Sequence, residues 1–483
     1  MKRINKYLVA CIFASMFGLS SCEKDFLDVN TDPNNPLEST PELTLSTGIG
    51  YTAYTMGNQF QILGNFWSQH WTQSYGAGQF RDLDSYRIQS NTYDRPWQYL
   101  YSGALNDFKY VSEQSAKVDR PNHAAIADIM MAYVYQVLVD GYDQVPFSEA
   151  LQGSNNLNPK YDAGKDIYAA LIPMIDGGVN KITEGSLPEG GDLVYQGDMD
   201  MWRKFANTLK LKIYLRQAYV SENQSAVQTG VAALLTKNEF IETGEDAEVP
   251  FVDQSLNRNP IYQTETTTFS AANIVASNTI LNYLNTNNDT RIGAFFKRAA
   301  SAPNAGNFAG LDQGITGTGV KSSLLASSFS KPSSAVAGPT APVPFISAAE
   351  SYFLQAEAEL RYGSFANAQA RYEDGVNASF AYNNVSRTGV TIPALSSSET
   401  LEENLEKIIT QKWVAMSGRQ GFEAWTELRR TGYPSFIKPS ASSVLGSTLM
   451  PNRLLFSSSE SLRNSNTPAI IDIHERVWWD RKN

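Results

Sequence analysis

The sequence predicts a mainly α-helical protein, built on a tetratricopeptide-like scaffold of helical hairpins with long irregular loops and little β-strand. Three observations support this fold class. Apolar residues recur at spacings of three and four residues in many segments. Residues 351–378 carry the pattern of one tetratricopeptide hairpin. Strand-like runs are sparse, and residues 248–252 form the one candidate for a small sheet element.

The predicted helices begin near residue 60. One helix face is formed by Phe60, Leu63, Trp67, Trp71 and Tyr75. A second helix is predicted from Trp97 to Val111, and Asn122 is the predicted N-cap of a third that ends near Asp140. Further helices are predicted at residues 167–182, 201–219 and 227–235, and from an N-cap at Ser270 to Asn285.

The hairpin at residues 351–378 is the clearest predicted element. Gly363 ends its first helix, and the second helix begins near Phe365. Small residues let two antiparallel helices approach, and aromatic residues fill the space between them. A single hairpin cannot bury its apolar faces alone, so several hairpins are expected to stack. Another helix is predicted from Glu399 to about Ser417.

Two long stretches show no helical period. Residues 299–344 are crowded with Gly, Ser, Ala and Pro, and residues 434–483 are irregular. A long stretch of this composition inside a compact protein is usually a set of functional or mobile loops. We therefore predict a single domain at residues 43–483, with a loop-rich insertion at about residues 299–344.

The first residues predict an exported lipoprotein. Lys2, Arg3 and Lys6 precede an apolar run at residues 7–19, as in a secretory signal peptide. Residues 19–22, Leu-Ser-Ser-Cys, resemble a lipobox, in which the cysteine is lipidated and becomes the mature N-terminus. We predict a removed signal peptide at 1–21, a lipid anchor at Cys22 and a tether at 22–42. The alternative is an ordinary secretory signal with an incidental cysteine.

Cysteine usage and the tether exclude several kinds of site. Cys11, the only other cysteine, leaves with the signal peptide, so no disulfide, cysteine-ligated zinc or cysteine nucleophile is expected. Asp28, Asn30 and Asp32 alternate as in a calcium loop. An EF-hand loop needs Gly at its sixth position and Glu at its twelfth, where this chain has proline and serine. A run of Asx turns is the favoured interpretation, and no metal or cofactor is predicted.

The composition suits a flat, hydroxyl-rich ligand and disfavours nucleic acid. The formal net charge is −10, which disfavours binding to a phosphate backbone. The chain has 24 Tyr, 23 Phe and 8 Trp, together with abundant Asn, Gln, Ser and Thr. Aromatic rings stack on the C–H faces of sugars, and amides bond the hydroxyls. The three histidines pair with no nucleophile motif, and no G-x-S-x-G is present.

The candidate ligand-binding residues lie in the first third of the chain. Aromatic residues alternate with Arg, Asp and Asn after the glycine-containing residues 76–78, a pattern that suits a ligand platform. The candidates are Trp71, Tyr75, Arg81, Tyr86 and Trp97. The alternative is that the stripe of Trp67, Trp71 and Tyr75 is hairpin core. Glu357 and Glu359, two residues apart on a helix, face different sides and cannot flank one glycosidic bond.

Several stretches together resemble the SusD/RagB-like outer-membrane lipoproteins, in their SusD-like branch. The resemblance covers essentially the whole chain. Besides the lipobox and residues 28–36, its pieces are residues 138–150, 195–198, 202–209, 356–360, 411–413, 423–434, 451–456 and 477–480. Each piece is short, but their order along the chain makes the resemblance specific.

The resemblance implies a cell-surface protein that is anchored in the outer membrane by lipid. Such proteins bind a nutrient, usually an oligosaccharide and in some branches a peptide. They work with a SusC-like TonB-dependent transporter and catalyse no reaction, and related members place much of their sugar site in the N-terminal third. Two further hypotheses remain open from the residues alone: a lipid-anchored, all-helical glycosidase and a purely structural scaffold.

Overall fold

The computed structural model describes residues 39–184, 190–269, 273–315 and 324–482. The chain divides into a leading segment that ends at Thr40 and a body from Pro41 to Asn483. The predicted signal peptide, the Cys22 anchor, the calcium-like run and all but the end of the tether lie outside the described residues. The first helix begins at Pro41, two residues before the predicted start of the domain at residue 43.

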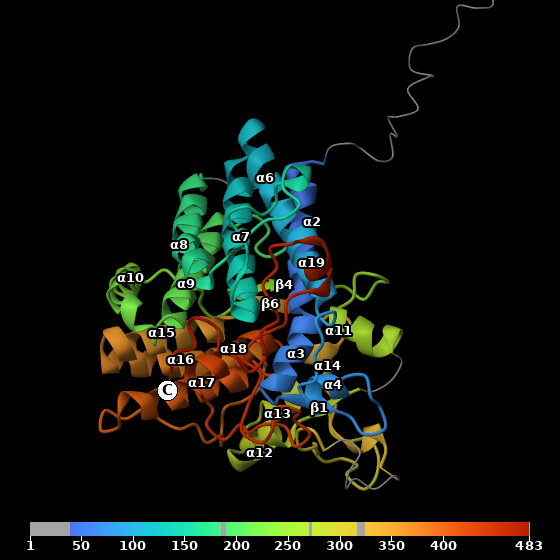
Figure 1. The fold of residues 1–483 in the computed structure, drawn as a ribbon. Helices are drawn as coiled ribbons and strands as arrows, with labels where there is room; N and C mark the ends of the chain where they lie inside the picture. Colours follow the sequence, from blue (N-terminus) through green and yellow to red (C-terminus); the bar gives the residue numbers. More distant parts are fainter. Residues whose placement is uncertain (1–38, 185–189, 270–272, 316–323, 483) are drawn as a thin grey trace, which may run out of the picture. The chain divides into compact units, whose positions relative to one another are not determined.

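The body is built mainly from α-helices (Figure 1). They are α2 (Pro41–Met56), α3 (Gln59–Trp67), α4 (Arg81–Asp84), α5 (Asp94–Gln98), α6 (Asn106–Lys117), α7 (Pro121–Tyr142), α8 (Gly164–Lys181), α9 (Met199–Arg216), α10 (Gln224–Lys237), α11 (Pro260–Tyr262), α12 (Asn278–Thr286), α13 (Ile292–Phe295), α14 (Ser334–Ala337), α15 (Ala348–Tyr362), α16 (Phe365–Tyr382), α17 (Leu401–Ala415), α18 (Gly421–Thr431) and α19 (Ser458–Arg463).

Short strands and single helical turns complete the body. The strands are β1 (Trp71–Gln73), β2 (Val145–Pro146), β3 (Tyr161–Asp162), β4 (Ala247–Val249), β5 (Ile274–Ala276) and β6 (Val343–Ile346). They pair antiparallel as β1 with β5, β2 with β3, and β4 with β6. Two π-helical segments are η2 (Tyr99–Leu105) and η5 (Gln263–Thr268), and three 3-10 turns are η3 (Gly153–Asn155), η4 (Ser221–Asn223) and η6 (Ala326–Ser328).

The predicted tetratricopeptide hairpin is confirmed as α15 and α16, which pack side by side (Figure 1). The ring centroids of Phe353 and Tyr372 lie 6.1 Å apart between the two helices. A Cβ on Gly375 would lie 2.9 Å from the Phe353 ring, so the small residue is what permits the close approach. The next helix after the hairpin is α17, which follows a loop at residues 383–400. A capping box between Thr400 and Glu403 fixes its start.

Several predicted helices differ from the structure in their limits; the helix predicted from Trp97 to Val111, for example, is divided among α5, η2 and α6. The helix predicted from Phe60 through Tyr75 ends at Trp67, and residues 71–73 pair with β5 as a strand. The predicted cap Ser270 lies outside the described residues; the helix that was expected to follow it begins at Asn278, capped by Ser277. Asn122 is not a cap, because α7 begins at Pro121; its amide instead bonds Thr183.

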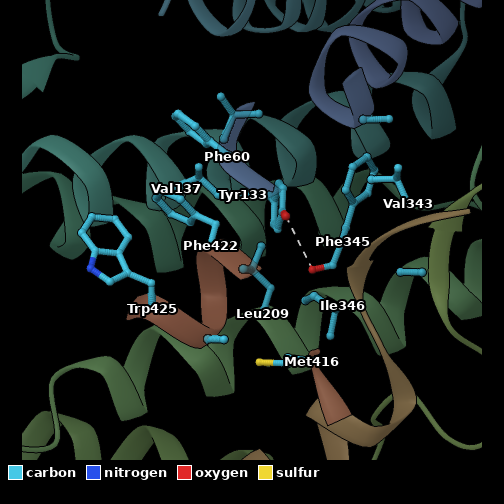
Figure 2. Packing of buried hydrophobic residues seen from close by; sticks show 14 of the residues in the cluster. Phe60, Tyr133, Val137, Leu209, Val343, Phe345, Ile346, Met416, Phe422 and Trp425 are labelled. Carbon is cyan, nitrogen blue, oxygen red and sulfur yellow. Dashed lines mark hydrogen bonds between the residues drawn. The ribbon is translucent and has the colours of Figure 1, made fainter. Parts of the chain in front are cut away.

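The core lies where α3, α7, α9 and α18 meet around β6. Figure 2 shows Phe60 of α3 beside Phe422 of α18, and Tyr133 of α7 pointing toward the carbonyl of Phe345 on β6. Helix α7 is long and apolar enough to cross a membrane by length and composition, but 89% of that stretch is buried within the protein. Its apolar character therefore reflects its place in the core.

A network of buried charges joins α7, α9, α15, α17 and α18. Every member has a side chain that is at most 8% exposed. The carboxylates are Asp140, Glu350, Glu357, Glu423 and Glu427, and the cations are Lys212, Arg216, Arg361, Lys412 and Arg430. The two sets are equal in number, so the network is electrically balanced.

Arg216 of α9 lies at the centre of this network. Its guanidinium nitrogens lie 2.8 Å from Glu423 and 3.3 Å from Asp140, and it also contacts Glu427. Burial acts to raise the pKa of Glu423, but Arg216, Lys212 and Lys412 together outweigh it and lower that pKa to about 2. The carboxylates of α18 are therefore held ionised in the interior by cations from α9 and α17.

We predict that Arg216→Met destabilises the fold strongly. The substitution leaves three buried carboxylates without one of their cations, which costs about 3–5 kcal/mol in the free energy of unfolding. Arg371→Met is the matched control, because Arg371 pairs with Asp374 where the two side chains are 30% and 44% exposed. That pair contributes at most about 1 kcal/mol. Urea unfolding of both variants measures the difference, and equal losses would contradict a structural role for the network.

Candidate functional site

A hollow of about 440 Å³ lies among α2, α3, α4, α5 and η5. Its lining comes from three stretches of the chain, residues 54–62, 79–95 and 264–269. We call it the N-terminal hollow. Its volume lies in the range of about 300–1,000 Å³ that is typical of small-molecule sites.

The lining of the N-terminal hollow combines aromatic rings, amides and charged groups. The aromatic residues are Tyr54, Phe80, Tyr93 and Phe269, the amides are Asn58, Gln59, Gln79 and Gln89, and the charged residues are Asp82, Arg87 and Arg95. The Phe80 and Phe269 rings meet edge to face at 6.0 Å. Phe80 also contacts Phe66 of α3 at 5.7 Å, which joins one wall of the hollow to the core.

Hydrogen bonds hold the wall formed by residues 79–84 in place. The indole nitrogen of Trp67 donates to the carbonyl of Leu83 at 3.0 Å, and the N–H of Phe80 donates to the Gln73 side chain at 2.6 Å. The buried carboxylate of Asp84 accepts from the Thr72 hydroxyl at 3.1 Å and from the Gly314 N–H at 3.0 Å. Burial raises the pKa of Asp84 to about 7, against the opposing effect of these hydrogen bonds.

The C-terminal tail secures the rest of this wall. The N–H of Ser440 donates to the Tyr86 hydroxyl at 3.0 Å, and that hydroxyl donates to the sulfur of Met450 at 3.3 Å. Asp94, at the start of α5, accepts hydrogen bonds from Ser457 at 2.7 Å and from Ser458. Irregular residues near the end of the chain thus fix the shape of a site that lies in its first third.

The structure corrects the predicted roles of three candidate residues. Trp71, Tyr86 and Trp97 are only 0%, 1% and 3% exposed, so their rings present no face to a ligand. Trp71 lies on β1, and the Trp97 ring packs against Tyr101 and Tyr142 at 4.7 and 5.0 Å. Trp71 therefore occupies the core position that was stated as the alternative. Burial of a large aromatic ring there stabilises the fold.

Tyr75 and Arg81 lie outside the N-terminal hollow as well. Tyr75 is half-buried against a small cluster that contains Val275, Leu311 and Phe329, and Arg81 is exposed at the first position of α4. A ligand contact by either residue stays a prediction. The predicted stretch after residues 76–78 does form a wall of the hollow. The residues that line it are neighbours of the candidates, namely Phe80, Asp82, Arg87 and Arg95.

Sequence reasoning missed two parts of the lining. Tyr54, Asn58 and Gln59 lie at the junction of α2 and α3, where an amide pair directly after Gly57 was an available signal for a polar turn. Residues 264–269 gave no such signal, because a run of threonines around one glutamate is equally typical of a solvated loop.

A second, shallower hollow of about 320 Å³ adjoins the first. It is lined by Thr47, Gly50, Tyr51, Tyr54 and Tyr99, and we call it the tyrosine face. Tyr51 and Tyr54 are 37% and 38% exposed, and both rings lie within 5.6 Å of the Tyr99 ring. Tyr54 lines both hollows, so the N-terminal hollow and the tyrosine face form a continuous aromatic surface.

The candidate site shows no metal chemistry. Among the described residues, no group of three or more His, Cys, Asp or Glu side chains could hold a metal ion. Within the described lining of the N-terminal hollow, Asp82 is the one carboxylate. The aromatic rings of the lining can stack on a ligand, and its amides can form hydrogen bonds with it.

Solved structures of SusD homologues share the helical fold of this body. A chitin-binding SusD homologue from Flavobacterium johnsoniae is 24% identical, with a TM-score of 0.75 over 90% of this chain and 98% of that one. SusD homologues from Bacteroides uniformis and Bacteroides ovatus are 23% and 22% identical, with TM-scores of 0.74 and 0.76. Each of these two matches covers 91% of this chain and 99% of the other.

The chain belongs to the SusD-like family described as "Starch-binding associating with outer membrane", whose profile matches residues 33–457. The predicted family is thereby confirmed. SusD-like proteins are binding proteins, in agreement with the expectation that the chain is not an enzyme. No curated protein matches the chain.

We predict that Asp84→Ala destabilises the protein in a pH-dependent way. The change leaves two interior donors, the Thr72 hydroxyl and the Gly314 N–H, without their acceptor, at a cost of about 2 kcal/mol. The folded pKa of Asp84, about 7, lies above its ordinary value of 3.8, so its contribution to stability falls as the pH rises through 7. The loss on substitution should therefore be larger at pH 5 than at pH 8, by about 2–3 kcal/mol, so that little of it remains at pH 8.

Asp82→Ala is the control for this experiment, because Asp82 is the exposed neighbour on the same helix. It should change the free energy of unfolding by no more than about 0.5 kcal/mol at either pH. Chemical denaturation of both variants at the two pH values provides the measurement. A pH-independent loss for Asp84→Ala would show that the carboxylate is not the titrating group.

Proposed function

We propose that the protein is a cell-surface receptor that captures an oligosaccharide across the N-terminal hollow and the tyrosine face. The observation that carries the proposal is the continuous surface of rings and amides that Tyr54 joins. A pyranose presents an apolar C–H face and an equatorial rim of hydroxyls. Tyrosine rings pack on the first and amides bond the second, so the two parts of the site match the two parts of a sugar.

The lining supports capture over hydrolysis. Glycosidases of the common kind need two carboxyl groups on either side of the scissile bond, about 5–10 Å apart. The described lining contributes Asp82 alone. Glu357, one of the two glutamates that could be mistaken for such a pair, is buried and lies 2.6 Å from Arg430, in the charge network. A peptide ligand would use the same hollow, and a ligand screen decides between the two cargoes.

We further propose that the receptor is held by lipid at Cys22 and works with a SusC-like TonB-dependent transporter. Support comes from the lipobox at residues 19–22 and from the outer-membrane association in the family description. The transporter is the partner that the resemblance to SusD/RagB-like lipoproteins implies.

We predict that Tyr54→Ala weakens the binding of an oligosaccharide by about 5–10-fold, the loss of one aromatic stacking contact of about 1 kcal/mol. A glycan array first identifies a ligand, and isothermal titration then measures both proteins. Tyr214→Ala is the matched control, because Tyr214 is half-buried on α9 away from both hollows. A ligand whose affinity is the same in Tyr54→Ala as in the parent protein would place the binding site elsewhere.

We predict that lipidated protein, extracted in mild detergent from its own outer membranes, co-purifies with a TonB-dependent barrel in stable proportion. Cys22→Ala should instead be found in the soluble fraction, because acyl chains supply the membrane affinity. Mass spectrometry of the co-purified proteins and fractionation of the variant provide the two measurements. A membrane-bound Cys22→Ala protein would contradict the anchor, and extraction without any barrel would contradict the partnership.

A further inference from the structure

We infer that the glycan bound in the N-terminal hollow is anionic, with carboxylate or sulfate groups that Arg87 and Arg95 recognise. This inference rests on the proposed function and adds the class of ligand. It follows from the charged groups that line the hollow.

Arginines in this acidic protein almost always have partners. Exposed examples pair with carboxylates, as Arg203 does with Asp200 and Arg387 with Glu373. Buried examples are satisfied by the charge network or by backbone carbonyls. Among the described residues, the arginines whose side chains make no hydrogen bond, ion pair or ring contact are Arg81, Arg87, Arg95 and Arg463. Three of these four lie in residues 81–95, the wall of the N-terminal hollow.

The carboxylates of this wall do not neutralise its arginines. Asp84 is buried and accepts hydrogen bonds from Thr72 and Gly314, and Asp94 is occupied by two serines of the C-terminal tail. Asp82 lines the hollow but lies within 4 Å of no arginine or lysine nitrogen among the described residues. The charged groups of the described lining are thus two guanidiniums and one carboxylate, in a chain of formal charge −10.

A free guanidinium is best matched by an oxyanion. Arginine presents paired N–H donors that bind a carboxylate or sulfate in a bidentate way, with hydrogen bonds about twice as strong as neutral ones. Tyr54 and Phe80 in the same lining can pack on the sugar ring that carries the anion. Arg81, exposed one position before Asp82 but outside the lining, is a third unpaired arginine in this stretch of the chain.

The test compares neutral, uronate-containing and sulfated oligosaccharides on one glycan array, followed by titration of the strongest binder. We expect the strongest binders to be anionic. A comparison of the uronate-containing with the sulfated oligosaccharides shows whether the arginines recognise carboxylate or sulfate. The double variant Arg87→Gln/Arg95→Gln should lose at least about tenfold in affinity for them. Raising the salt concentration from about 20 to 200 mM should weaken binding by the parent protein and affect the double variant little.

Arg463→Gln is the matched control, because Arg463 is also unpaired but lies on α19 outside the lining of the hollow. It should bind as the parent protein does. Strong binders that are all neutral, with an affinity that Tyr54→Ala lowers and the double arginine variant does not, would overturn the anionic ligand and leave the proposed function standing. Absence of binding to every glycan on the array would overturn both.

Discussion

The charge network between α9, α15, α17 and α18 is the constraint on which the rest of the structure depends. It fixes α18 through Glu423 and Glu427, and α18 in turn fixes α3. At their crossing a Cβ on Gly64 would lie 2.0 Å from the backbone of Gly421, and the Phe60 and Phe422 rings stack at 4.7 Å. The C-terminal half of the chain thereby positions the helix that begins at one edge of the N-terminal hollow.

Buried charges are an expensive way to join helices, since apolar residues of equal volume would often be as stable. Their use here suits a helical scaffold whose helix faces are broadly apolar and could slide past one another. Arg216 can pair with three carboxylates in only one register of α9 against α18, whereas leucine side chains could pack in several registers. The network thus explains how long irregular loops can be carried on the scaffold without loss of a defined site.

Much of the fold was predictable from local sequence, and the site was predictable only as a region. Helices with a strong apolar period and a clear stop, such as α15 with Gly363, follow from local rules. The end of α3 does not, because residues 71–73 become a strand by pairing with β5, some 200 residues away. Trp71, Tyr86 and Trp97 have the composition of a ligand platform, but their partners in the core decide that they face inward. Arg87 and Arg95, which lie between them, face the hollow.

The central claim is that ligand binds where residues 54–59, 79–95 and 264–269 come together. Backbone hydrogen exchange, measured with and without a saturating oligosaccharide, tests it most directly, because it requires no substitution. The account predicts slower exchange in these three stretches together, with little change in the hairpin of α15 and α16. Protection confined to other loops, such as residues 299–315, would contradict it.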